Sequence, residues 1–151
     1  MNYYVLPKCK DPNNQELCLT LRVSGPKPFI YSVVVATKDL EREFQTWTPI
    51  EWLDRGKDQG FILLNPETNM VIVAPDDDQA VKVNPLASLA AIDRVFWKFV
   101  GSEYGAIQLQ ANTKMNLNVK GSGPYPSGTL VLAYSWKKKQ SNAMWTFHGQ
   151  P

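Results

Sequence analysis

The chain has 151 residues, of which 44% are hydrophobic, 20% charged and 11% aromatic. These fractions are typical of a globular domain and exclude a disordered, collagen-like or coiled-coil chain. Sixteen Lys and Arg against fourteen Asp and Glu leave a formal charge of +2, too weak a field to favour nucleic acid or an acidic membrane as the main partner. Polar residues and prolines interrupt every apolar run, so no membrane insertion is expected.

The N-terminal segment, MNYYVLPKCKDPNNQ, has no charged flank followed by an apolar run. We therefore expect no secretory signal and a cytoplasmic or nucleocytoplasmic protein.

Residues for the common enzyme chemistries are missing from the sequence. The only histidine, His148, lies close to Pro151, and there is no Walker-type phosphate loop and no GxGxxG, CxxC, HExxH or GxSxG motif. The run Asp76–Asp78 lacks the spacing of a calcium loop and is interpreted as a solvated turn. We expect no catalytic activity, no metal and no cofactor.

Strand-like segments, bounded by turn residues, recur along the chain. The N-terminal third is the least regular, with strands predicted in YYVLPKC, LCLTLRV and PFIYSVVVA. The corresponding third strands of the later units are predicted in QAVKVNPLA and GTLVLAYSW. From the end of the first of these segments, Leu86–Arg94 begins with helical spacing, but Asp93 interrupts its apolar face, so one turn in a loop is expected rather than a helix.

Two segments align without a gap, GFILLNPETNMVI at Gly60–Ile72 and GAIQLQANTKMNL at Gly105–Leu117. The matched positions before the turn alternate as in a strand, and each copy predicts a β-hairpin. The matched pairs are Gly60 with Gly105, Ile62 with Ile107, Leu64 with Leu109, Thr68 with Thr113 and Met70 with Met115.

The two cysteines are too few for a disulfide-scaffolded module. Leu17 stands where the other units carry Met70 and Met115, which places Cys18 on the opposite face of its strand. A bond to Cys9 would require the first hairpin to place the two residues opposite each other. We predict free thiols without a redox role.

Three tryptophans mark one phase of the repeat. Trp47, Trp97 and Trp145 lie about 50 residues apart, each followed by one polar and one apolar residue, and we assign them to the core with the two matched methionines. They predict a single domain, 1–151, with repeats of approximately 1–54, 55–101 and 102–151. Since about four strands per unit bury their inward faces best in a closed barrel capped by hairpins, the predicted fold class is all-β, a β-trefoil of three pseudo-repeats.

A Gln or Asn shortly before the recurring tryptophan, in Gln45-Thr46-Trp47 and Asn142-Ala143-Met144-Trp145, resembles the QxW signature of ricin-B-type lectins. The order of LTLRV, EFQTW, FILLNPET, MNLNVKGSG, TLVLAYSW and NAMW resembles, over nearly the whole chain, the trefoil lectins of the Euonymus europaeus agglutinin type. The resemblance implies a carbohydrate-binding protein whose partners are glycans or glycoconjugates.

In such lectins the sugar lies in a shallow pocket of one unit, and the third unit matches best. The resemblance assigns it Asn118 where the family commonly has Asp, Tyr134 and Trp136 as aromatics, and Asn142 near the final tryptophan. Two departures are the missing acid and Ala143 at the family's Gln position. The chemistry agrees, because a pyranose needs an aromatic plane and a few fixed amides, to which Asn116 adds one.

For Tyr134 and Trp136, which lie on one side of their predicted strand, the alternative is core packing or a surface ridge. The second unit has Val71 and Val73 in place of the asparagines, so no sugar is expected there.

The first unit remains a second candidate site. It keeps polarity at Thr20, Arg22 and Gln45, but Thr37 and Asp39 stand where the third unit's aromatics would stack.

The alternative function is a trefoil protease inhibitor acting through a rigid loop such as Asp54–Gln59 or Gly121–Gly128, and a third is a protein-binding trefoil. The run Lys137–Lys139 is interpreted as a solvated turn, or as a rim that favours an anionic glycan. Because one shallow site binds a monosaccharide only near millimolar, useful affinity would come from an extended glycan or from several sites presented together, as in a homo-oligomer.

Overall fold

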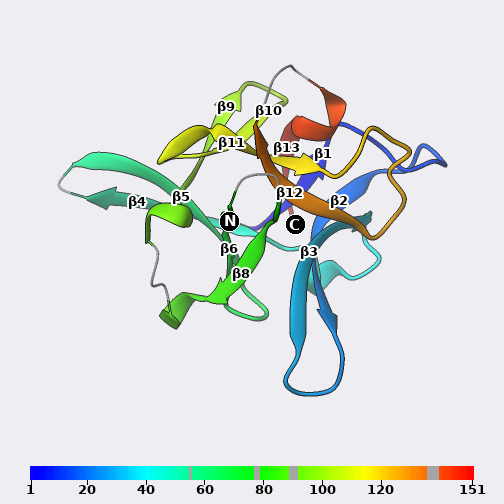
Figure 1. The fold of residues 1–151 in the computed structure, drawn as a ribbon, viewed down its shortest axis with the longest axis horizontal. Coiled ribbons are helices and arrows are strands. Elements are labelled where there is room, and N and C mark those ends of the chain that lie inside the picture. The colour runs from blue at the N-terminus through cyan, green and yellow to red at the C-terminus, as the bar shows by residue number, and fades with distance from the viewer. Residues whose placement is uncertain (55, 77–78, 89–91, 136–139) are drawn as a thin grey trace.

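A computed structural model gives the fold and describes residues 1–54, 56–76, 79–88, 92–135 and 140–151. In this part of the chain the regular elements are strands and single 3-10 turns (Figure 1), so the all-β prediction is confirmed. None of the described helices is long or apolar enough to cross a membrane.

The strands are β1 (Tyr3–Pro7), β2 (Leu17–Ser24), β3 (Ile30–Thr37), β4 (Thr48–Asp54), β5 (Lys57–Asn65), β6 (Met70–Val73), β7 (Gln79–Ala80), β8 (Lys82–Pro85), β9 (Trp97–Gly101), β10 (Gly105–Leu109), β11 (Asn112–Val119), β12 (Thr129–Ser135) and β13 (Trp145–Gly149). The 3-10 turns are η1 (Arg42–Phe44), η2 (Leu86–Ser88), η3 (Ile92–Arg94) and η4 (Ser141–Ala143).

Six strands close a barrel. The ladders β13–β1, β4–β5 and β9–β10 are antiparallel pairs, and three single bridges join them into a ring. The bridges are Tyr3 with Trp47, Phe61 with Trp97 and Gly105 with Trp145. Closure leaves the barrel without a free edge, and the pairing of β1 with β13 brings the two chain ends together near the centre of Figure 1.

Three further strand pairs, β2–β3, β6–β8 and β11–β12, cap this barrel. Cross-links such as Thr129 with Val35 on β12 and β3 connect neighbouring hairpins. The segment 54–59, suggested above as an inhibitory loop, is mostly strand, because Asp54 pairs with Lys57 in a tight hairpin.

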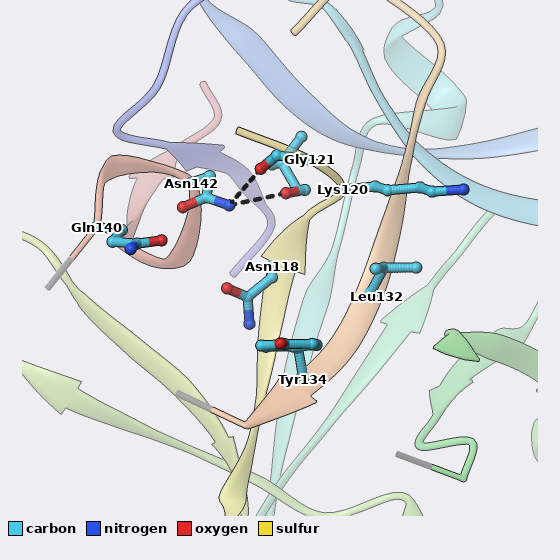
Figure 2. A pocket seen from close by; sticks show the side chains of 8 residues that line it. Asn118, Lys120, Gly121, Leu132, Tyr134, Gln140 and Asn142 are labelled. Atoms are coloured by element: carbon cyan, nitrogen blue, oxygen red, sulfur yellow. Dashed lines mark hydrogen bonds between the residues drawn. The ribbon is translucent and has the colours of Figure 1, made fainter. Parts of the chain in front are cut away.

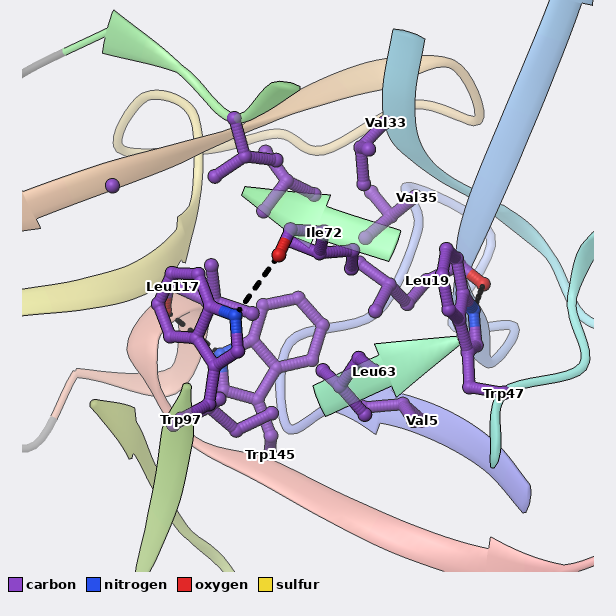
Figure 3. Close-up of a cluster of buried hydrophobic side chains, with 14 of the residues drawn as sticks. Val5, Leu19, Val33, Val35, Trp47, Leu63, Ile72, Trp97, Leu117 and Trp145 are labelled. Carbon is purple, nitrogen blue, oxygen red and sulfur yellow. Dashed lines mark hydrogen bonds between the residues drawn. The ribbon is translucent and has the colours of Figure 1, made fainter. Parts of the chain in front are cut away.

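The three recurring tryptophans are fully buried and join the barrel to the cap (Figure 3). Each indole Nε1 donates a hydrogen bond to a backbone carbonyl on the first strand of its unit's cap hairpin. The bonds run from Trp47 to Leu19 at 2.9 Å, from Trp97 to Ile72 at 3.3 Å and from Trp145 to Leu117 at 2.8 Å. The predicted core assignment of the tryptophans and of Met70 and Met115 is confirmed.

The gap-free alignment of the repeats is wrong by one residue in its first strand. Leu63 lies in the barrel core with Ile107, whereas Ile62, the residue matched to Ile107, belongs to a separate apolar cluster outside the barrel. The register shifts between Gln108 and Leu109, which lengthens the third unit's hairpin by one residue. One inserted residue exchanges the inward and outward faces of a strand.

Both cysteines are free and buried, which confirms the predicted free thiols. Cys9 lies in the barrel core, and Cys18 packs with Tyr4 and Leu6 on the other face of β2. Burial raises the pKa of Cys9 to about 11 and that of Cys18 to about 12.

We expect these thiols to react slowly with a thiol reagent such as Ellman's at about pH 8, because the thiolate is the nucleophile and burial suppresses it. The folded protein should react about a hundredfold more slowly than the protein in denaturant, where two thiols become available. The rate of colour release measures this, and equal rates in both conditions would show that the cysteines are accessible.

The indole bonds predict a graded response to Trp→Phe substitution. Phenylalanine keeps an aromatic ring but leaves the buried carbonyl without a donor, which costs about 1–3 kcal/mol. Because the Trp97 bond is the longest, at 3.3 Å against 2.8 Å for Trp145, Trp97→Phe should lose less free energy of unfolding than Trp145→Phe. Urea denaturation of the two variants tests the order, and the reverse order would contradict it.

Candidate functional site

The candidate site lies on the outer face of the third unit's cap hairpin. Along β11, Met115, Leu117 and Val119 face the barrel core. Alternation therefore turns Asn116 and Asn118 to the opposite face. This face is the one that the sequence predicted to hold a sugar.

A pocket of about 320 Å³ opens beside this face (Figure 2). Its walls come from the end of β11, from β12 and from the segment around η4. The lining residues are Asn118, Val119, Lys120, Gly121, Leu132, Tyr134, Gln140 and Asn142. Three of the five predicted site residues, Asn118, Tyr134 and Asn142, are thus brought together.

Asn142 fixes the upper wall of the pocket from a buried position in η4. Its Nδ2 donates to the carbonyl oxygens of Val119, at 3.0 Å, and of Gly121, at 3.2 Å. The Gly121 oxygen also accepts a hydrogen bond from the Tyr125 hydroxyl at 3.2 Å. Gly121 has φ +96°, a conformation that favours glycine, so the turn after β11 is held by both its backbone and its partners.

Asn118 lies between Asn142 and Tyr134 in the pocket (Figure 2). Its Nδ2 donates to the Asn116 carbonyl at 2.9 Å. Asn142 thus donates twice and Asn118 once to backbone carbonyls, and no described residue donates to either Oδ1. The pocket offers these oxygens as uncharged acceptors of fixed orientation.

Tyr134 supplies the aromatic part of the wall, with 38% of its surface exposed. It stands opposite Asn116 in the β11–β12 register. The alternative that Tyr134 packs in the core is excluded by this exposure. A ring of this kind presents a flat apolar face next to the amide oxygens, which suits the C–H face and hydroxyl rim of a pyranose.

The other two predicted site residues do not take part in the described pocket. Asn116 is fully buried, donates from Nδ2 to the Lys114 carbonyl at 3.2 Å, and has no partner for Oδ1 among the described residues. Asn116 is therefore bonded to the backbone of its own strand and does not line the cavity. Trp136 lies outside the described residues, together with Lys137–Lys139.

Sequence reasoning did not assign five of the lining residues to the site. They are Val119, Lys120, Gly121, Leu132 and Gln140. The alternation of Asn116 and Asn118 could have found Lys120, which is the next position on that face. No comparable signal marks Gln140, because it enters the pocket through the packing of the segment before η4.

The equivalent position in the second unit is filled by apolar side chains. Val71 and Val73, which replace the two asparagines, pack with Ile62, Val95 and Phe96 in one buried cluster. The expectation that the second unit lacks a polar rim is consistent with this packing.

The first unit is closed by hydrogen bonds between its own residues. Gln45 is fully buried and its Nε2 donates to the Thr37 carbonyl at 2.8 Å and to the Thr20 hydroxyl at 3.3 Å. Its Oε1 accepts from the Asp39 backbone N–H at 2.8 Å, and the Tyr4 hydroxyl donates to the Asp39 carboxylate. Burial, together with this bond, raises the pKa of Tyr4.

The position of Tyr134 in the first unit is Ala36, not Thr37 as the sequence suggested. Cys18 pairs with Ala36 as Asn116 pairs with Tyr134. The strand register, which the sequence does not reveal, sets this correspondence. An exposed aromatic at this position is therefore found in the third unit and not in the first.

Metal chemistry has no support in the described part of the chain, where no group of three His, Cys, Asp or Glu could hold an ion. Asp76 is exposed and forms an ion pair with Arg94 at 3.4 Å, while Asp77 and Asp78 lie outside the described residues.

Comparison with known proteins defines the architecture. No protein-family model and no curated protein sequence matches the chain. The designed 3-fold symmetric protein ThreeFoil superposes with a TM-score of 0.73 at 15% sequence identity, over 99% of both chains. The fold is a β-trefoil. The trefoil also superposes on the Macrolepiota procera ricin B-like lectin in complex with lactose, with a TM-score of 0.67, 18% identity and coverage of 97% and 94% of the two chains.

A third trefoil neighbour is the C-half of the earthworm R-type lectin in complex with GalNAc. Its TM-score is 0.65 at 12% identity, and the match covers 99% of this chain and 98% of that one. At these identities the likeness establishes the fold, and what the pocket binds must be argued from its own residues.

Asn142 provides a test of how the pocket of this trefoil is held. We expect Asn142→Ala to lower the free energy of unfolding by about 1–3 kcal/mol, because the Val119 oxygen loses its amide donor and the Gly121 oxygen keeps only the bond from Tyr125. Asn142→Asp should be at least as destabilising, since a carboxylate cannot donate and faces the same two oxygens. Urea denaturation of both variants measures the effect. If Asn142→Asp left the free energy of unfolding unchanged, Asn142 Nδ2 would not be the group that faces the two carbonyl oxygens.

Proposed function

We propose that the protein is a carbohydrate-binding protein without catalytic activity that holds one sugar ring in the pocket of its third unit. The observation that carries the proposal is the meeting of an exposed tyrosine ring with two orientated amide oxygens, those of Asn118 and Asn142, in one cavity of about 320 Å³. The ring would stack on the C–H face, and adjacent hydroxyls would donate to the oxygens.

The trefoil neighbours support this proposal, because two of them are lectins that were solved with lactose and with GalNAc. Membership of the Euonymus europaeus agglutinin type stays a prediction from the sequence motifs, as does the contribution of Trp136.

The contrast between the units supports a proposal of one functional site per chain. The second unit's position is filled by the apolar cluster that contains Val71 and Val73, and the first unit's by the hydrogen bonds of Gln45. Since one shallow site gives a monosaccharide affinity near millimolar, about −4 kcal/mol, the natural ligand would be an extended glycan, or several chains would act together.

The proposal predicts that Tyr134→Ala weakens binding by about five- to thirtyfold, or about 1–2 kcal/mol, through loss of the stacking face. A glycan array identifies the ligand, and titration calorimetry then compares wild type and variant and gives the number of sites. The matched control is Tyr104→Ala, which removes a partly buried tyrosine outside the pocket whose ring lies 5.5 Å from the Lys8 Nζ. Equal affinity of Tyr134→Ala and wild type would place the sugar elsewhere.

A further inference from the structure

Charge is distributed unevenly along the chain. From Tyr104 to Pro151 the sequence contains no Asp or Glu and five lysines, whereas all fourteen acidic residues lie before Tyr104 with eleven Lys and Arg. The overall charge of +2 therefore conceals a C-terminal segment, 104–151, with a formal charge of +5. All eight residues that line the pocket belong to this basic segment.

Two of the five lysines flank the pocket face of β11. Asn116 and Asn118 alternate on one side of the strand, and Lys120 follows at the next such position. Lys114 lies two residues before Asn116, where the register between β10 and β11 is irregular. Both lysines are exposed, and neither forms an ion pair with another described residue. At about 3.4 Å per residue, they lie roughly 20 Å apart, a span of several sugar rings.

No carboxylate lines the described pocket. Where an acid would repel a negatively charged ligand by Coulomb's law, Asn118 presents an uncharged oxygen. Figure 2 shows the Lys120 side chain directed away from the two asparagines, on the side of Leu132. The Lys120 charge thus lies at the edge of the pocket, away from Asn118 and Asn142.

We propose that the ligand of this site is an acidic oligosaccharide, in which one ring occupies the Tyr134 pocket and a neighbouring ring carries a carboxylate or sulfate group towards Lys120. This proposal rests on the proposed function of the same pocket and adds the chemical class of its ligand. Asp77 and Asp78 lie outside the described residues, but they precede Gln79 in the chain, and Gln79 pairs with β12 of the third unit. Even if both of their charges are subtracted from those of the five lysines, a charge of +3 is left.

The test compares three matched oligosaccharides, one neutral, one with a sulfate ester and one with a carboxylated sugar, by titration calorimetry. At about 50 mM salt we expect at least one acidic ligand to bind about tenfold more tightly than its neutral counterpart, and this advantage should shrink to about twofold at about 500 mM salt, because exposed charges are screened. The sulfate and carboxylate arms distinguish the two sources of charge.

Lys120→Gln should reduce the ratio of acidic-ligand affinity to neutral-ligand affinity about threefold. Lys27→Gln is the matched control, since it removes the same charge from the turn between β2 and β3 in the first unit. Thermal melting of both variants verifies that they fold as the wild type does.

The outcomes separate the two proposals. Neutral and acidic ligands of equal affinity would overturn the acidic class and leave the carbohydrate function intact, whereas binding of none of the three would overturn both. Acidic ligands that bind Tyr134→Ala as tightly as wild type would indicate a general polyanion surface and would also overturn the inference.

Discussion

The hydrogen bond from a buried indole to a cap carbonyl is the interaction on which the rest of this structure depends. It recurs three times, at Trp47, Trp97 and Trp145. The backbone of each of these residues also forms the single bridge that joins two ladders of the barrel. One residue per unit therefore closes the ring of strands and attaches the hairpin above it, so barrel and cap cannot shift independently.

This shared attachment leaves the outer face of each cap hairpin free to differ. The inner face must fill the barrel, because core volume is tightly constrained. The outer face has been filled with valines and Phe96 in the second unit, with the Gln45 network in the first and with an open pocket in the third. Three copies of one backbone arrangement thus hold three different chemistries.

The open pocket is rigid for the same reason. Asn118 bonds to its own strand, and Asn142 bonds to the end of that strand and to the turn beyond it. Since β11 is anchored from below by the Trp145 bond to Leu117, the amide oxygens are positioned before any ligand arrives. Such preorganisation lowers the entropy lost when a small polar ligand binds.

By itself the sequence determined the fold class, the threefold repeat and the buried tryptophans, because periodic apolar residues and a recurring large side chain report burial directly. The prediction of a site in the third unit came from the resemblance of its motifs to those of trefoil lectins. Only the tertiary structure decided the register, which moved the equivalence from Ile62 to Leu63 and from Thr37 to Ala36. It also decided that Asn118 and Gln140 line the pocket, whereas Asn116 is buried and does not. Register and pocket membership depend on contacts between segments distant in the chain, and such contacts leave no local signal.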